Sequence, residues 1–239
     1  MKYWIVIPCY NEEKNLPDLI SSLKTFPDNY QVEFILVENG SVDGSRNYMK
    51  QIEADVAPKI RFVWVDQNQG YGYGIQQGLK EASGDYVGWI HADMQLNPHD
   101  LVKFFDYLET NGKNEKLFLK GYRRNRKMIE YAFSYGMGVF ETLLFGTKMC
   151  EVMSMPFIVP GEMLHNLDQW PKDFAHDIYA YVQARHHGYR TVHIRVNMKD
   201  REKGASSWNT GFVSRIRQSI KIMKASIAIK KQWRNEVEK

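Results

Sequence analysis

Three side chains with metal-binding chemistry follow a short apolar run in the first hundred residues. His91, Asp93 and Gln95 come directly after residues 86–90, at the spacing i, i+2, i+4. In extended backbone this spacing directs all three side chains to one side. Oxygen ligands suit Mg²⁺ and an imidazole also suits Mn²⁺, so this set could hold a divalent cation beside a diphosphate. Taken alone, an aspartate after a strand, such as Asp93, is more often a turn or helix-cap residue than a metal ligand.

Short apolar runs alternate with amphipathic stretches through residue 111 and predict the elements that position these side chains. The runs that read as buried strands are residues 3–7, 32–37, 60–65 and 86–90. Helical spacing of apolar residues separates them, which predicts an α/β fold with a mostly parallel sheet covered by helices on both faces. Ligands bind such sheets at the carboxyl ends of the strands, where Asp93 is expected.

The pattern changes beyond residue 111. We expect a short strand at 117–119, a helix over 129–145 interrupted by Gly136 and Gly138, and then a loop-rich segment. The remaining expected elements are a helix within 173–187, a strand at 189–196 and a basic helix at 210–233. We therefore expect one domain over residues 1–209, with a nucleotide-binding half (1–111) and an acceptor-side half (112–209), followed by a C-terminal amphipathic helix (210–239).

Composition places the chain among ordinary soluble proteins. It has 239 residues, 44% hydrophobic and 25% charged, which is enough for one sizeable core. Its two cysteines, Cys9 and Cys150, imply no disulfide framework and favour a reducing compartment. No secretory signal and no run of about 18 apolar residues is present, so we expect no membrane-spanning helix and a cytoplasmic location.

The basic charge is concentrated in the tail. Residues 199–239 contain eleven Lys or Arg against four Asp or Glu, whereas the whole chain carries +4. Apolar residues recur there at helical spacing, at Ile216, Ile220, Met223 and Ile227. This stripe either lies in a membrane interface or packs on the domain or on a second subunit. Nucleic acid is not expected as a partner, because the tail lacks aromatic stacking positions among its cations.

Four ordered motifs resemble glycosyltransferase family 2. They are residues 7–13, 37–45, 82–85 and 92–95. Gln95, residues 173–177 with Gly188 and Tyr189, and residues 200–206 carry a finer resemblance to the polyprenyl-phosphate (dolichyl-phosphate) mannosyltransferase-like branch. This family implies a GT-A fold, a nucleoside-diphosphate sugar bound through GDP or UDP, a divalent metal, Mg²⁺ or Mn²⁺, and transfer with inversion.

The resemblance also implies roles for individual residues. The positions that match the nucleotide-sugar site are Pro8, Tyr10, Glu12, Glu38, Asn39, Asp43 and Arg123. Asp93 and Gln95 match the metal ligands, and His91 replaces the usual first aspartate. Arg201 resembles a diphosphate clamp, and Asp177 stands where an acidic residue meets the acceptor. Asp177 would be a general base for a hydroxyl acceptor, or would position a phosphate that is already ionised.

These observations favour an inverting glycosyltransferase that acts at the inner face of the cell membrane on a lipid-linked or glycan acceptor. Glu38 and Asn39 stand where most relatives have two aspartates, which keeps a non-catalytic nucleotide-sugar-binding protein as an alternative. A transferase that acts on a soluble sugar hydroxyl is the other alternative. The chain's partners would then be the sugar donor, the acceptor, the membrane surface through the C-terminal helix and a second copy of the chain.

Overall fold

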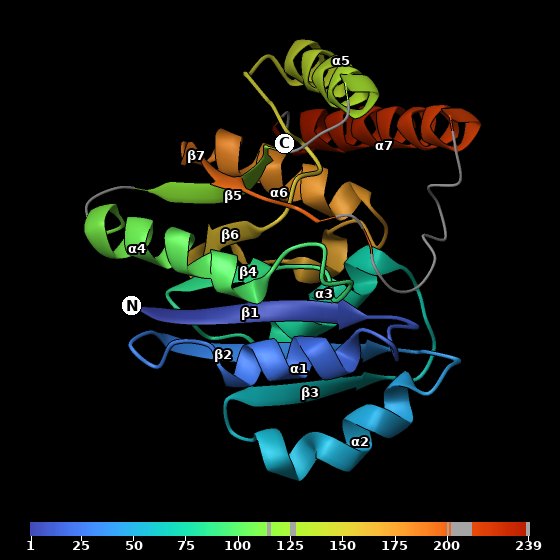
Figure 1. The fold of residues 1–239 in the computed structure, drawn as a ribbon. Coiled ribbons are helices and arrows are strands. Elements are labelled where there is room, and N and C mark those ends of the chain that lie inside the picture. The colour runs from blue at the N-terminus through green and yellow to red at the C-terminus, as the bar shows by residue number, and fades with distance from the viewer. Residues whose placement is uncertain (114–115, 125–127, 200, 202–211, 238–239) are drawn as a thin grey trace.

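A seven-stranded sheet forms the centre of the computed structural model, which describes residues 1–113, 116–124, 128–199, 201 and 212–237 (Figure 1). The strand order is β3-β2-β1-β4-β6-β5-β7. The strands are β1 (Lys2–Cys9), β2 (Gln31–Asn39), β3 (Ile60–Val65), β4 (Tyr86–Trp89), β5 (Leu117–Arg123), β6 (Phe157–Pro160) and β7 (Arg190–Val196). β6 pairs antiparallel with β4 and β5, and the other pairs are parallel. The mostly parallel α/β sheet is confirmed.

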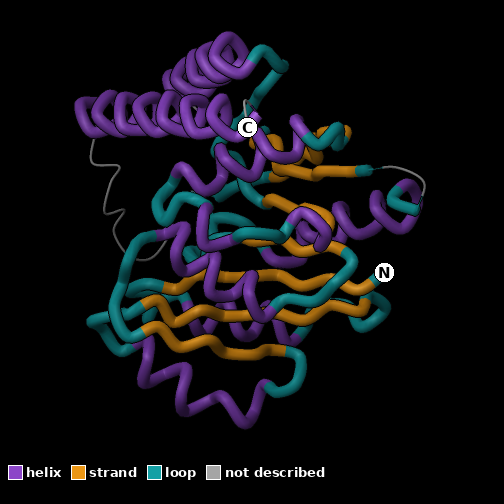
Figure 2. Tube along the Cα trace, turned by 180° about the vertical axis from the view of Figure 1, so that it is seen from behind, coloured by secondary structure: helices purple, strands orange, loops and turns teal. Residues whose placement is uncertain are grey.

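Helices cover both faces of the sheet, as Figures 1 and 2 show from opposite sides. One face carries α1 (Leu16–Lys24), α2 (Ser45–Val56) and α4 (Val102–Asn111). The other carries α3 (Tyr71–Glu81) and α6 (Ala175–His186). Beyond α6 lie α5 (Met128–Phe145) and α7 (Phe212–Val237), and short 3-10 turns occupy Pro98–Leu101, Gly161–Met163 and Leu167–Gln169.

The central strands contain uninterrupted apolar runs, such as residues 3–7 of β1 and 34–37 of β2, because both of their faces are buried. In β1, Ile5 packs into the cluster under α1 and α4, whereas Val6 packs into the cluster under α3 and α6. Successive side chains of a strand point to opposite faces, so a covered sheet needs apolar residues at every position. This requirement explains why uninterrupted apolar runs marked the strands in the sequence.

Two expectations about the second half of the chain were wrong. β6 lies inside the segment expected to be loop, and it completes the sheet between β4 and β5. α5 is continuous through Gly136 and Gly138. A Cβ at Gly138 would lie 3.0 Å from the carbonyl oxygen of Met149, so this glycine permits close packing of the helix on the 149–150 segment.

The predicted stripe of the C-terminal helix does not pack on the domain, so that alternative is wrong, whereas contact with a membrane interface or a second subunit stays a prediction. Ile222, Ser226 and Ile229 are buried, whereas Ile216 and Ile220 are exposed. The tail contains apolar residues on two sides of the helix. Helical spacing identified the exposed side, and it carries no information on which of the two sides packs on the domain. Among the described helices, none combines the length and apolar character needed to cross a bilayer.

A buried carboxyl group joins α5 to α7 and predicts a pH-dependent contact. Glu141 is fully buried, and its Oε1 accepts a 2.6 Å hydrogen bond from Ser226 Oγ, while Oε2 has no partner. Burial raises the pKa of Glu141 to about 7. The folded state therefore holds this proton more tightly than the unfolded chain, and the associated stability is lost as pH rises through about 7.

We expect Glu141→Gln to reduce the loss of thermal stability between pH 6 and pH 8. Melting temperatures of wild type and variant at both pH values measure this difference. Glu53→Gln, at an exposed position of α2, is the matched control and should behave as wild type. Equal pH dependence in all three proteins would contradict the assignment.

Candidate active site

The carboxyl ends of β2, β1 and β4 meet at one edge of the sheet. These strands are neighbours and run in parallel, and the register places Cys9 opposite Glu38. The loop after each strand therefore opens at the same edge. This is where the sequence motifs after the first, second and fourth strands were expected to converge.

Five charged or ionisable groups share this edge. His91 is influenced by Asp93, Arg201 and Arg123, and Glu12 by Arg201 and Asp93. Burial lowers the pKa of His91, the two arginines lower it further, and Asp93 opposes them. At neutral pH the imidazole is therefore neutral, which is the form that binds metals.

The spacing argument for the metal ligands was wrong, because residues 91–95 are not extended. Met94 has a left-handed backbone with φ of 58°. The backbone nitrogen of Gln95 donates to Asp93 Oδ1 at 3.2 Å, and Gln95 Nε2 donates to the carbonyl oxygen of Lys199 at 3.1 Å. A turn around Asp93 thus replaces the expected alternation.

Within the described residues, no group of three His, Cys, Asp or Glu side chains is placed to hold a metal by itself. One carboxylate (Asp93) and one neutral imidazole (His91) fit a cation that takes its other ligands from a bound diphosphate. Arg123 adds a buried Nε without a hydrogen-bond partner, which an anionic ligand could accept from. The donor set therefore fits a metal shared with substrate.

Arg201, which follows β7 in the sequence, contacts the loop after β1. Its Nη2 lies 2.5 Å from Glu12 Oε1, and Glu12 Oε2 accepts a 2.5 Å hydrogen bond from Asn15 Nδ2. Burial raises the pKa of Glu12, although Asn15 and Arg201 act in the opposite direction. The other residues of the 200–206 motif lie outside the described residues.

The acidic residue at the end of β2 has partners within the chain. Glu38 is fully buried, and its Oε1 accepts from the backbone nitrogen of Ser41 at 2.6 Å. Its Oε2 pairs with Arg46 Nε at 2.6 Å, and Arg46 also donates to the carbonyl oxygen of Val65. Glu38 therefore holds the loop after β2 in place, and its partner Arg46 was not expected from the sequence.

We expect Arg46→Ala to destabilise the fold by about 3 kcal/mol, because it leaves the buried Glu38 carboxylate without its ion pair. Chemical denaturation measures the loss. Glu38→Ala should be milder, since Arg46 is partly exposed and can regain water. Additive effects in the double variant would contradict a direct pair.

The remaining residues of the nucleotide-site prediction differ in exposure. Asn39 is buried, its Nδ2 donates to the carbonyl oxygen of Gly70 at 3.1 Å, and its Oδ1 has no partner. Tyr10 is exposed, so its ring is open to stacking. Asp43 accepts from the backbone nitrogens of Ser45 and Glu13, which fixes the loop. Pro8 is half-buried in β1.

Asp177 is buried in the first turn of α6 rather than open to solvent. Its Oδ1 accepts a 2.9 Å hydrogen bond from Trp89 Nε1, and the Tyr71 hydroxyl is close enough for each group to shift the pKa of the other. Burial raises the pKa of Asp177 to about 7, although Trp89, Lys120 and Tyr71 lower it. The ring of Tyr71 lies 5.3 Å from that of His91, so Tyr71 lies between Asp177 and His91.

Trp89, Tyr71 and Lys120 were not expected to shape the site. Trp89 had been interpreted only as part of a buried strand, and no role had been predicted for Tyr71. Lys120 is fully buried, donates to the carbonyl oxygen of Val152 at 2.9 Å and lies 4.1 Å from the ring centre of Phe157. The sequence signal that was available is a lysine within an apolar strand.

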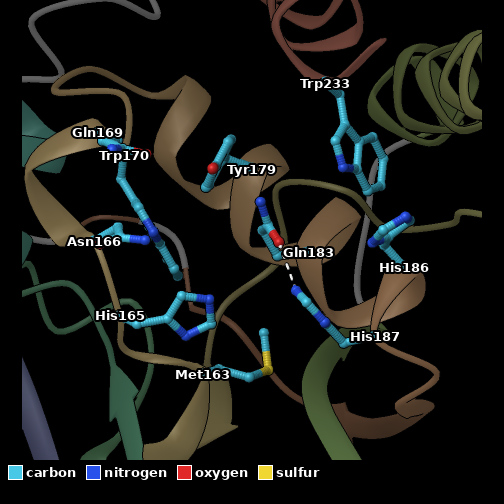
Figure 3. Close-up of a pocket in the computed structure, with 10 residues that line it drawn as sticks. All are labelled: Met163, His165, Asn166, Gln169, Trp170, Tyr179, Gln183, His186, His187 and Trp233. Atoms are coloured by element: carbon cyan, nitrogen blue, oxygen red, sulfur yellow. Dashed lines mark hydrogen bonds between the residues drawn. The ribbon is translucent and has the colours of Figure 1, made fainter. Parts of the chain in front are cut away.

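A separate cavity of about 250 Å³ lies at the other end of α6 (Figure 3). Figure 3 shows His165, His186 and His187 around it, with His187 Nε2 3.1 Å from Gln183 Oε1. His186 is nine residues after Asp177, about 14 Å along the helix. None of the residues expected at the nucleotide or metal site lines this cavity.

Comparisons with known proteins identify the family and the fold of this chain. The family model for glycosyl transferase family 2 matches residues 4–132. An undecaprenyl-phosphate 4-deoxy-4-formamido-L-arabinose transferase from Proteus mirabilis is 26% identical over 222 residues, covering 87% of this chain and 63% of that protein. A protein of the same description from Aeromonas hydrophila is 35% identical over 106 residues, covering 43% and 32%. The chain thus spans less than two thirds of the length of these relatives.

Solved structures of glucosyl-3-phosphoglycerate synthase from Mycobacterium tuberculosis share the fold. The complex with Mn²⁺, UDP and glucosyl-3-phosphoglycerate has a TM-score of 0.69 at 18% identity, covering 95% of this chain and 79% of that one. The complex with phosphoglyceric acid has a TM-score of 0.70 at 17% identity, with the same coverage. Sheet, helices and site edge therefore define a GT-A fold. With its family model matched over more than half of its length, the chain belongs to glycosyltransferase family 2.

Proposed function

We propose that this chain transfers one sugar, with inversion, from a nucleoside-diphosphate sugar to a polyprenyl phosphate at the inner face of the cell membrane. The observation that carries the proposal is the gathering of Asp93, His91, Arg123 and Arg201 at the carboxyl ends of β1 and β4. The names of the sequence relatives, which are undecaprenyl-phosphate transferases, support a lipid-linked acceptor.

Some residues of the site would bind the base of the donor, and others would bind the diphosphate that leaves. Tyr10 would stack on the base, and the buried Oδ1 of Asn39 would accept a hydrogen bond from a base N–H group. Asp93 and His91, with Gln95 beside them, would hold Mg²⁺ or Mn²⁺, which offsets the charge that develops on the leaving diphosphate. Arg123 and Arg201 would bind the same diphosphate oxygens through their guanidinium groups.

The burial of Asp177 favours a phosphate acceptor over a sugar hydroxyl. A general base must reach the proton that it removes. Asp177 is 1% exposed and its carboxylate accepts a hydrogen bond from Trp89, so it lies behind Tyr71 and His91 instead of facing the acceptor. An ionised phosphate needs no base, and Asp177 then acts as a positioning residue.

Asp177→Asn tests this assignment. With a phosphate acceptor, we expect transfer to fall by no more than about tenfold, because asparagine keeps the oxygen that accepts the hydrogen bond from Trp89. The pKa of Asp177 is raised from 3.8 to about 7, so its stabilising contribution is lost as pH rises through that window. The variant should therefore melt higher than wild type at pH 8. A loss of about a thousandfold would instead identify a hydroxyl acceptor activated by Asp177.

The whole proposal is tested by product formation. Purified protein with Mn²⁺ and radiolabelled UDP- or GDP-sugars is incubated with undecaprenyl phosphate, and separately with soluble sugars, and labelled product is separated by chromatography. We expect label in the lipid fraction. Donor binding with no transfer to any acceptor and no donor hydrolysis would instead identify a nucleotide-sugar-binding protein without catalysis, and label only in soluble products would replace the lipid acceptor.

A further inference from the structure

Four side chains form a row across the sheet, on the face that α6 covers. The strand register pairs Trp89 of β4 with Phe157 of β6, and Phe157 with Lys120 of β5. On the far side, Lys120 pairs with His193 of β7. Cross-strand partners point to the same face of a sheet. The ring of Phe157 stacks on that of Trp89 at 5.2 Å and 3°, and Lys120 Nζ lies 4.1 Å from its centre, so Phe157 separates the indole from the ammonium.

Helix α6 contacts both ends of this stack. Asp177 Oδ1 accepts the 2.9 Å hydrogen bond from Trp89 Nε1. Tyr181 lies one helical turn later, and its ring centre is 4.8 Å from Lys120 Nζ. Residues four apart lie on the same side of a helix. The side of α6 that faces the sheet therefore carries a carboxylate at the Trp89 end and an aromatic ring against the ammonium at the other end.

Two opposite charges are thus buried in one layer. Asp177 and Lys120 are both buried, and Lys120 is the only buried lysine or arginine among the residues that the structure describes. A buried charge is costly unless an opposite charge compensates it, and removing one partner of a buried pair leaves the other uncompensated. Burial raises the pKa of Asp177 to about 7, and the Lys120 ammonium acts in the opposite direction, in favour of the carboxylate.

We propose that Lys120 is the counter-charge of Asp177 and acts on the reaction as a positioning residue. In this role the ammonium stabilises the buried carboxylate, and the stack of Phe157 on Trp89 keeps the indole N–H directed at Asp177. Trp89 is the last residue of β4, two residues before His91. Loss of the ammonium therefore loosens the wall behind the proposed metal site and leaves the groups that bind the donor in place. The effect on the rate of transfer rests on the proposed function.

A double-mutant cycle in the unfolding equilibrium tests the pairing. Lys120→Met removes the ammonium from a side chain of similar length, and Asp177→Asn removes the carboxylate charge. At pH 8, where most of Asp177 is ionised, we expect Lys120→Met to raise the unfolding constant by about a hundredfold in the wild-type background, but by no more than about tenfold in Asp177→Asn. Urea denaturation measures both effects. Lys24→Met, at an exposed position of α1, is the control and should be neutral. Equal effects in the two backgrounds, or a double variant that does not fold, would overturn the pairing.

Glu151 is the alternative counter-charge, and a second cycle distinguishes it from Asp177. Glu151 is buried beside Val152, whose carbonyl oxygen accepts a 2.9 Å hydrogen bond from Lys120 Nζ. In this cycle Glu151→Gln takes the place of Asp177→Asn. We expect the effect of Lys120→Met to stay near about a hundredfold. A larger reduction with Glu151→Gln than with Asp177→Asn would overturn the proposal and assign the ammonium to Glu151.

Transfer rates test the positioning role. Lys120→Met, Asp177→Asn and the double variant should each lower kcat by the same factor, between about threefold and about tenfold, with the KM for the donor unchanged. The double variant should be no slower than the single variants, because Lys120 acts through Asp177. A multiplied loss in the double variant, or wild-type kcat in Lys120→Met, would overturn this role. A wild-type protein that transfers no sugar would refute the proposed function, and the unfolding cycle, which needs no substrate, would still decide the pairing.

Discussion

Asp93→Ala is expected to reduce sugar transfer by about a thousandfold, while the folded structure is retained. Asp93 follows β4 and, in the proposed metal site, supplies the carboxylate beside a neutral His91. Without it, the site keeps its arginines but loses the anchor for the cation that neutralises the leaving diphosphate. Initial rates at saturating Mn²⁺ and donor measure the effect, and melting curves verify the fold.

Asp85 provides a matched control for this variant. It directly precedes β4, at the opposite end of the strand from Asp93, and its carboxylate accepts from the backbone nitrogen of Lys2. Asp85→Ala removes the same group far from the site edge, so its turnover should stay close to wild type. If Asp93→Ala turned over as fast as Asp85→Ala, the metal role of Asp93 would be wrong.

Arg201→Ala should lower the rate of transfer by about a hundredfold or more, with a smaller change in donor affinity. Arg201 reaches the loop after β1 and lies 2.5 Å from Glu12, so its guanidinium is already held at the site edge. The rate should change more than the donor affinity because negative charge on the diphosphate grows as the bond between sugar and diphosphate breaks. Separate measurement of kcat and KM for the donor distinguishes the two effects.

Two further variants test whether Arg201 acts on the diphosphate directly or only through Glu12. Arg201→Lys keeps the charge but loses the planar fork, and should recover only part of the rate. Glu12→Gln removes the ion-pair partner of Arg201, and a drop equal to that of Arg201→Ala would mean that the arginine acts only by holding Glu12. Arg61→Ala, at an exposed arginine of β3, is the control and should be neutral.

Much of the fold could be predicted because burial on both faces of the sheet demands continuous apolar strands. β3 was predicted with its observed bounds. β6 was missed because its four residues follow Pro156 and end at Pro160, and two prolines so close together indicate a loop when tertiary pairing is unknown. The expected break in α5 failed because Gly138 serves a close contact with Met149, so packing outweighed helix propensity.

The site was predicted by motif position more successfully than by geometry. The motifs placed Asp93 and Glu12 at one edge of the sheet, and the structure brings them together. The extended spacing of residues 91–95 failed because φ at Met94 is positive, which no residue type in that stretch signals. The burial of Asp177 under Trp89 depends on a contact 88 residues apart, and such contacts have no local sequence pattern.

Calorimetric titration of nucleoside diphosphates is the most direct test of a cation seated at Asp93. UDP and GDP are each titrated into wild type and Asp93→Ala, with Mn²⁺ and with a chelator. We predict that one of the two nucleotides binds wild type at least tenfold more tightly with Mn²⁺ than with the chelator, and that Asp93→Ala loses this difference. Equal affinity with and without metal, or a metal effect that survives in Asp93→Ala, would contradict the proposed site.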